Sequence, residues 1–103
     1  MSDRIDALRR LLERNPGDAR LRFGLAAEYE KLGRWQDVVE QLRAYLDGTD
    51  DQGNAWGRLG AALRALGRDD EAREAYRRGV EAAQRHNHPS MAAEFSDILD
   101  DLS

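Results

Sequence analysis

Apolar side chains recur every three to four residues in six separate segments of the chain, with polar side chains between them. In the last segment, Met91, Phe95, Ile98 and Leu102 fall on one stripe of a helix. This spacing is typical of amphipathic α-helices, and no segment shows the two-residue alternation of a β-strand. The pattern predicts helices over residues 3–14, 19–32, 35–46, 54–66, 69–85 and 90–102.

The residues between these segments have the chemistry of helix ends. Asp18 offers a side-chain oxygen to cap the second helix, and Ser2 or Asp3 can cap the first. Gly33 and Gly67 follow the second and fourth helices, where we expect a left-handed backbone conformation. Because every connection is short, consecutive helices are expected to pack antiparallel.

The apolar pattern also repeats along the chain. Leu25 and Gly33 recur 34 residues later as Leu59 and Gly67, at the same places in their helices. A fixed period of this length is typical of stacked helical hairpins, in which each hairpin buries its apolar face against its neighbours. The repeat therefore predicts an all-α array whose surfaces bind something else.

The second repeating unit contains a spaced set of apolar and small residues: Trp56, Leu59, Gly60, Leu63, Ala72 and Tyr76. In order and spacing this set resembles the tetratricopeptide repeat family, with Trp56 expected in the core. The preceding unit is a weaker copy, because Arg22 takes the place of the tryptophan and Val38 that of the small alanine. The resemblance implies a right-handed α-α superhelix of antiparallel helix hairpins, with six helices.

The repeat frame describes one domain over residues 1–103. Residues 1–16 resemble the second half of a repeat, and residues 19–52 and 53–86 are two full repeats. Residues 89–102 form a capping helix that resembles the first half of another repeat. Six helices thus supply about the three repeats that such an array needs.

The composition excludes several classes of function. The chain has no cysteine among its 103 residues, so disulfides and thiolate metal sites are ruled out. Its net charge of −4 argues against general nucleic-acid binding. No apolar run approaches the ~20 residues that cross a bilayer, and the N-terminal residues lack the apolar segment of a signal peptide. We therefore expect a cytoplasmic protein that does not bind membranes.

The polar residues show no arrangement that favours catalysis. The two histidines, His86 and His88, flank a turn, where we expect them to be exposed to solvent. They lack the additional nearby ligands that a metal site needs. Gly57 and Gly60 lie inside a helix, so they are expected to be packing glycines and not a phosphate-binding loop. We expect no enzymatic activity, cofactor or metal.

The family resemblance implies a concave groove lined by the first helix of each hairpin. Carried over residue by residue, the groove would contain Arg20, Phe23, Ala27, Lys31, Asn54, Arg58, Ala61 and Arg64. Arginines pair with carboxylates through bidentate, charge-assisted hydrogen bonds, which suits an extended peptide with acidic groups. Phe23 either anchors an apolar side chain of the peptide or packs within the protein, and packing is the favoured interpretation.

The last helix leaves a second interpretation of this groove open. Asp97, Asp100 and Asp101 would point toward the same groove, where they could pair with Arg58 and Arg64. Exposed ion pairs of this kind contribute only about 0.2–1 kcal/mol each. The groove is then either neutralised internally or open to an acidic peptide.

The main functional hypothesis is a non-enzymatic protein–protein interaction module that binds a peptide or a partner's helix. The first alternative is a homodimer that buries apolar faces at the ends of the array, around Ile5, Leu8 and Leu12 or around Ile98 and Leu102. A third and less favoured hypothesis is binding of single-stranded RNA through the arginine-lined helices.

Overall fold

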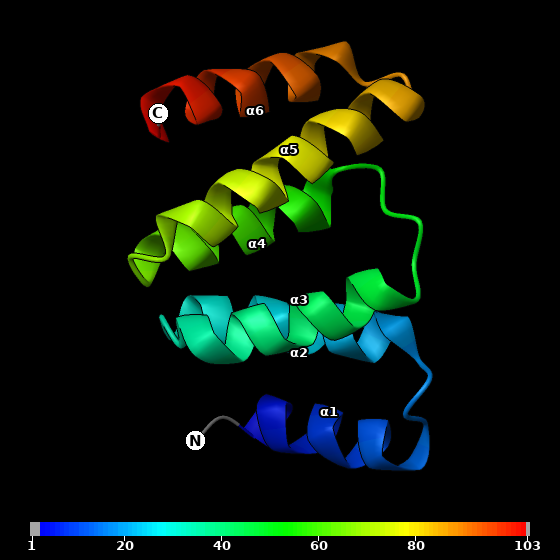
Figure 1. Cartoon of the computed structure of the whole chain (residues 1–103). Helices are drawn as coiled ribbons and strands as arrows, with labels where there is room; N and C mark the ends of the chain where they lie inside the picture. Colours follow the sequence, from blue (N-terminus) through cyan, green and yellow to red (C-terminus); the bar gives the residue numbers. More distant parts are fainter. Residues whose placement is uncertain (1–2, 103) are drawn as a thin grey trace. The chain divides into compact units, whose positions relative to one another are not determined.

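The computed structural model describes residues 3–102, and these form six α-helices with no strand among them (Figure 1). The helices are α1 (Asp3–Arg14), α2 (Ala19–Lys31), α3 (Trp35–Asp47), α4 (Asn54–Ala65), α5 (Asp69–Arg85) and α6 (Pro89–Leu102). The expected all-α fold is confirmed, and each helix end lies within one residue of its predicted position. The cap predicted at Ser2 falls outside the described residues.

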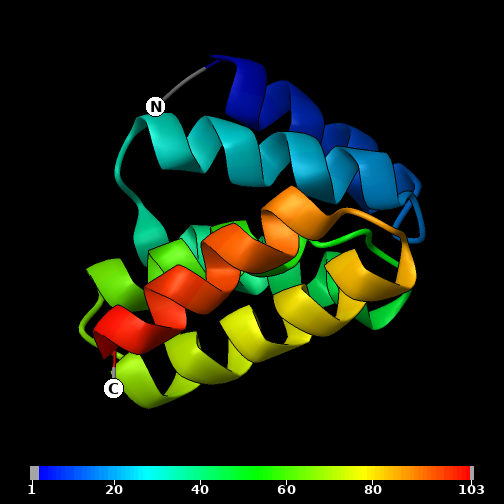
Figure 2. The same cartoon turned by 90° about the horizontal axis from the view of Figure 1, so that it is seen from above.

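The helices form two compact units, which divide between Thr49 and Asp50. In the first unit, α2 packs against both α1 and α3. In the second unit, α5 packs against both α4 and α6. Figure 1 shows α2–α3 and α4–α5 as antiparallel hairpins with tight turns, and Figures 1 and 2 both show α5 and α6 side by side. The hairpins expected from the short connections are therefore present.

The two hairpin turns are built in the same way. Gly33 and Gly67 have φ angles of 68° and 75°, in the left-handed region that disfavours residues with a Cβ atom. After the first glycine, the N–H of Arg34 donates to the carbonyl of Tyr29 at 3.0 Å, and the second turn contains the equivalent bond. This is the Schellman pattern that satisfies carbonyls at a helix end. The expected role of the two glycines is confirmed.

Aspartates cap the first helix of each hairpin, but only one of the two caps was expected. Asp18 accepts a hydrogen bond from the N–H of Arg20 at 3.0 Å, as predicted. At the start of α4, one carboxylate oxygen of Asp51 accepts from the N–H groups of Gly53 and Ala55, at 2.8 and 2.9 Å. Asp51 is only 9% exposed, and the sequence pattern had not singled it out.

The core of the first unit is aliphatic. Ile5, Leu25 and Leu42 are completely buried. Ile5 is therefore part of the core and not part of the exposed terminal face that the homodimer hypothesis assumed. Leu8, also named in that hypothesis, is half-buried and lies where a Cβ atom on Gly24 would contact it at 3.8 Å. Ile5 is unavailable to a dimer contact because α1 uses its apolar stripe against α2.

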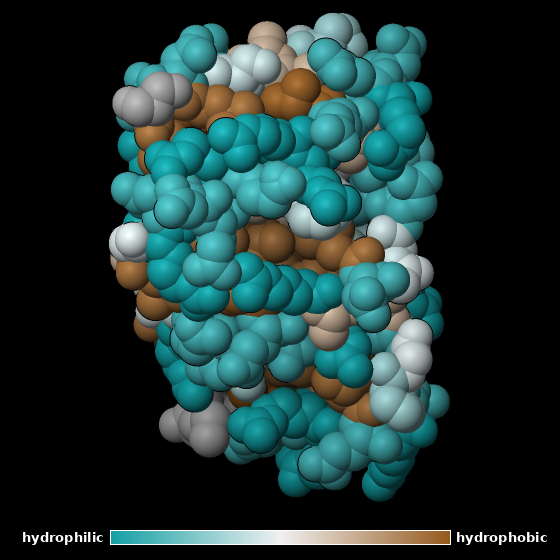
Figure 3. All heavy atoms as spheres, in the orientation of Figure 1, coloured by the Kyte–Doolittle hydropathy of each residue, from teal (hydrophilic) through white to brown (hydrophobic). Residues whose placement is uncertain are grey.

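The second unit is packed around small residues on α4 and α5. Gly60, Ala62 and Ala72 are buried there, as are the larger Leu59 and Leu63. Trp56 is only half-buried, contrary to the expectation that it belongs wholly to the core, and the guanidinium of Arg78 lies 5.8 Å from its ring centre. In Figure 3, hydrophilic side chains cover α5, while hydrophobic ones show in the seam between α5 and α6.

Candidate functional site

The two cations predicted on α2 have partners within the first unit. Arg20 lies 3.4 Å from the carboxylate of Asp18, and Lys31 lies 3.1 Å from Glu28, which Arg4 also contacts at 3.1 Å. The hydrogen bond from Arg20 lowers the pKa of Asp18. Hydrogen bonds from Lys31 first, and then from Arg4, lower the pKa of Glu28. The positive charge of this surface is therefore partly compensated by neighbouring carboxylates.

The aromatic residue predicted on α2 packs against α3. The ring centres of Phe23 and Tyr45 are 5.0 Å apart, with the planes tilted by 41°. Tilted ring pairs at this separation are favourable. Phe23 and Ala27 are both half-buried. The Phe23 ring thus makes the internal packing contact that we favoured over a role as a peptide anchor.

The residues predicted on α4 are more accessible. Asn54, Ala61 and Arg64 are exposed, and Arg58 is half-buried. The opposite side of the helix is buried around Leu59, which fixes the exposed side outward. Within residues 3–102, Arg64 makes no ion pair shorter than 4.0 Å, unlike the cations of α2. Its side chain is exposed to solvent.

The acidic residues of α6 are also exposed. Asp97, Asp100 and Asp101 form no ion pair with any residue in the range that the structure describes. Direct pairing of these carboxylates with the α4 arginines, which internal neutralisation requires, does not occur there. The surface contributed by α4 and α6 thus keeps charges of both signs exposed.

Two aromatic rings join α4 to the rest of the second unit. Phe95 of α6 lies against Gly57, where an added Cβ atom would come within 2.5 Å of its ring. Tyr76 of α5 lies against Gly60, where an added Cβ atom would come within 2.7 Å. The centres of the two rings are 5.7 Å apart. Both glycines are packing glycines, as expected, and Gly57 is covered by Phe95.

The hydroxyl group of Tyr76 experiences charges from both neighbouring helices. Burial raises the pKa of Tyr76 above 10.0, because the phenolate form loses hydration. The positive charge of Arg64 on α4 opposes this change, and the negative charge of Glu94 on α6 adds to it. The two side chains therefore lie near the same buried ring, although they belong to different helices. The family resemblance also implies that Glu94 lines the groove, but the sequence pattern does not predict its proximity to Tyr76.

His86 and His88, in the α5–α6 turn, both contact the segment that precedes α4. The Nε2 atom of His86 lies 3.2 Å from Asp50, which Arg85 also contacts at 3.1 Å. The Nε2 atom of His88 lies 2.7 Å from the amide oxygen of Gln52. Both histidines are half-buried, so the prediction of solvent-exposed turn histidines was wrong. Asp50 and Gln52, which partner them, are each 36 residues away from their histidine in sequence.

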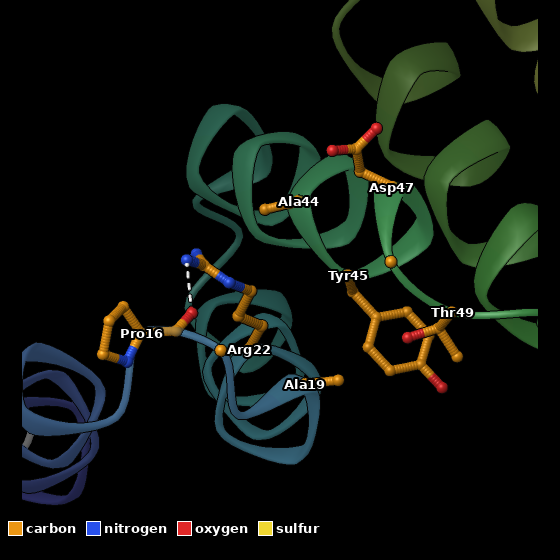
Figure 4. Close-up of a pocket in the computed structure, with 9 residues that line it drawn as sticks. Pro16, Ala19, Arg22, Ala44, Tyr45, Asp47 and Thr49 are labelled. Carbon is orange, nitrogen blue, oxygen red and sulfur yellow. Dashed lines mark hydrogen bonds between the residues drawn. The ribbon is translucent and has the colours of Figure 1, made fainter.

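A small pocket lies at one end of the first unit (Figure 4). Its volume is about 280 Å³, and its lining includes Arg22, Tyr45 and Thr49. Arg22 donates a hydrogen bond to the carbonyl of Pro16 at 3.1 Å, so its guanidinium secures the α1–α2 turn. Ligand sites usually span about 300–1,000 Å³. The residues that line the pocket include no histidine, cysteine or serine, and Asp47 supplies the one carboxylate among them.

Between residues 3 and 102, no three histidine, aspartate or glutamate side chains gather as potential metal ligands. In the same range, no helix has both the length and the apolar character needed to cross a membrane.

Comparisons with known proteins agree with this architecture. A solution structure of protein BPP2914 from Bordetella parapertussis superimposes with a TM-score of 0.79 at 28% identity, covering 99% of this chain and 89% of that one. The TPR repeat-containing protein PA0015 of Pseudomonas aeruginosa is 29% identical over 95 residues, covering 92% of this chain and 90% of its own.

A second relative is considerably longer than this chain. The small glutamine-rich tetratricopeptide repeat-containing protein 2 of Mycosarcoma maydis is 32% identical over 77 residues, or 75% of this chain and 22% of its own length. The family model for the tetratricopeptide repeat matches residues 1–83. The matched residues include the central motif from Trp56 to Tyr76. The chain belongs to the tetratricopeptide repeat family.

Proposed function

We propose that the protein is a non-enzymatic interaction module that binds a peptide, or the helix of a partner, on the exposed side of α4. Members of the tetratricopeptide repeat family generally mediate protein–protein interactions. The observation that carries the proposal is the exposed guanidinium of Arg64, which is not engaged by a carboxylate within the described residues. Arginine recognises carboxylates through paired hydrogen bonds, so the partner carries acidic groups.

The α2 surface has a secondary role in this proposal. Arg20 and Lys31 already contact Asp18 and Glu28, and Phe23 packs against Tyr45. A partner would have to replace those contacts, which reduces the net gain from binding there. The α4 residues Asn54, Ala61 and Arg64 therefore form the preferred binding surface.

The proposal is tested with a random peptide library displayed on phage. Peptides that enrich on the immobilised protein are labelled, and their affinities are measured by fluorescence anisotropy at near-physiological salt. Arg64→Glu should weaken binding by about tenfold or more, since hydrogen bonds to charged groups contribute about 1.5–3 kcal/mol. Arg77→Glu changes the charge equally at an exposed position on α5 and should leave the affinity nearly unchanged.

The folded state of each variant is checked by circular dichroism and thermal unfolding. Failure of every library peptide to enrich would contradict the proposal. Equal losses from Arg64→Glu and Arg77→Glu would also contradict it, because they would indicate a response to net charge alone.

A further inference from the structure

The surface formed by α4 and α6 is a fixed platform with two sides. Phe95 fills the space above Gly57, and Tyr76 fills the space above Gly60, so neither ring has room for an added methyl group beside it. Because protein interiors resist overpacking, rings in such close contact hold their helices at a defined separation. Side chains that project beside these rings are therefore held at a nearly constant distance from one another.

The two sides of this platform differ in the sign of their charge. Arg58 and Arg64 are the charged residues of α4, which contains no Asp or Glu. The charged residues of α6 are all acidic: Glu94, Asp97, Asp100 and Asp101. The charged side chains of α4 are thus all cationic and those of α6 all anionic, and the two helices meet where Phe95 lies against Gly57.

The opposite charges are close to the same ring without neutralising each other. Arg64 follows Gly60, which contacts Tyr76, by about one helical turn, and Glu94 precedes Phe95, whose ring lies beside that of Tyr76; both charged residues are exposed. Within the part of the chain that the structure describes, neither residue makes an ion pair shorter than 4.0 Å. Glu94, Asp97 and Asp101 follow one another at spacings of three and four residues, so they form one continuous stripe along α6.

We propose that the α4–α6 surface selects an extended peptide that carries both an acidic and a basic side chain. The acidic group pairs with Arg64 on α4, and the basic group pairs with Glu94 and its neighbours on α6. This inference rests on the proposed peptide-binding function and narrows its partner class. Like charges brought together are strongly unfavourable, so α6 rejects purely acidic peptides and α4 rejects purely basic ones.

The test compares three mixtures of short, fluorescein-labelled synthetic peptides that share a neutral background. The first mixture contains one Asp and one Arg at varied separations, the second two Asp residues, and the third two Arg residues. We expect the full chain to bind the first mixture about tenfold more tightly than either of the others. Arg64→Glu should shift the preference toward the third mixture, and Glu94→Lys toward the second.

Matched controls place the same charge changes on exposed residues of α5. Arg77→Glu and Glu81→Lys should leave the order of the three affinities unchanged. Circular dichroism establishes that each variant is folded. If the control variants shift the preference as much as the test variants do, the proposed selectivity is overturned, because net charge would then explain it.

The remaining outcomes separate this inference from the proposed function. The two-Asp mixture could bind as tightly as the mixed one, with no effect of Glu94→Lys. The proposed requirement for a basic side chain in the peptide would then be wrong, while peptide binding at Arg64 would stand. If no mixture binds in an Arg64-dependent manner, the binding function fails as well. Tighter, salt-sensitive binding of poly-uridine RNA to the same surface would overturn both in favour of a nucleic-acid partner.

Discussion

The ring of Tyr76 lies so close to Gly60 that a methyl group on residue 60 would come within 2.7 Å of the Cε2 atom of the ring. Tyr76 is 4% exposed, and its ring is also in contact with Phe95, so it has little room to move away. The absence of a side chain at position 60 is therefore what allows α4 and α5 to pair at their observed separation.

Gly60→Ala is expected to destabilise the protein. Overpacking of this kind costs about 1–3 kcal/mol, while the higher helix propensity of alanine returns about 1 kcal/mol. Gly24→Ala is the matched control, since its new Cβ atom would meet Leu8 at an ordinary 3.8 Å and leave only the propensity gain. Thermal unfolding should show opposite changes in midpoint for the two variants. An equal increase in both would contradict the packing that we describe.

Replacement of a hairpin glycine should destabilise the protein for a different reason. A Cβ atom on Gly67 would meet nothing within 4 Å, so the cost of Gly67→Ala comes from its φ of 75° alone. We expect a loss of about 1 kcal/mol or more, and a smaller loss for Gly67→Asn, because asparagine tolerates this conformation better. Urea denaturation of the two variants measures the difference. Equal stability of Gly67→Ala and the wild type would exclude the left-handed turn.

Removal of the buried cap on α4 should lower stability. Asp51→Ala leaves the N–H groups of Gly53 and Ala55 without their acceptor, and we expect a cost of about 1–2 kcal/mol. Asp51→Asn retains an acceptor oxygen and should lose less. Asp47→Ala, at an exposed position near the end of α3, serves as the control and should cause no loss. Chemical denaturation distinguishes the three variants.

The contacts of Asp50 predict a pH dependence in acid. His86 first, and Arg85 second, lower the pKa of Asp50 from its usual 3.8. Because the pKa of Asp50 is lower in the folded than in the unfolded state, its ionised form stabilises the fold. This contribution to the free energy of unfolding is complete above about pH 4 and disappears as the pH falls through the folded-state pKa. His86→Ala should move the pKa of Asp50 back toward 3.8, and Arg85→Gln should move it less. Carboxylate NMR titration measures these shifts; an unchanged pKa in His86→Ala would contradict the contact.

The position of Tyr76 between two charges predicts opposite pKa changes in two variants. Arg64→Ala should raise the pKa of Tyr76 further above 10.0, and Glu94→Gln should lower it. Because burial raises the folded-state pKa, the stabilisation from this group is present below about pH 10 and is lost as the pH rises through the folded-state value. NMR of the tyrosine ring carbons follows the titration without any ligand. If the pKa of Tyr76 moved in the same direction in both variants, Arg64 and Glu94 could not both lie close to its hydroxyl group.

Helix positions in this chain follow from local patterns. The apolar stripe from Met91 to Leu102 and the acidic first turn after Arg68 each act within one or two helical turns, so neighbouring residues alone indicate a helix. Gly33 and Gly67 end their helices for the same local reason, through the backbone conformation that each glycine permits. The 34-residue period then identifies the hairpins and the family.

The proposed binding surface depends on contacts between helices, which no local pattern encodes. The sequence gives no reason to separate the groove residues predicted on α2 from those predicted on α4. In the structure, Arg20 and Phe23 have internal partners, whereas Arg64 forms no ion pair within residues 3–102. Likewise, His86 reaches Asp50, and Glu94 lies near the ring of Tyr76, only because packed helices bring distant residues together. Helix formation depends on short-range backbone bonding, whereas side-chain partners and exposure depend on how whole helices pack; this is why the fold was predictable and the charge arrangement of the site was not.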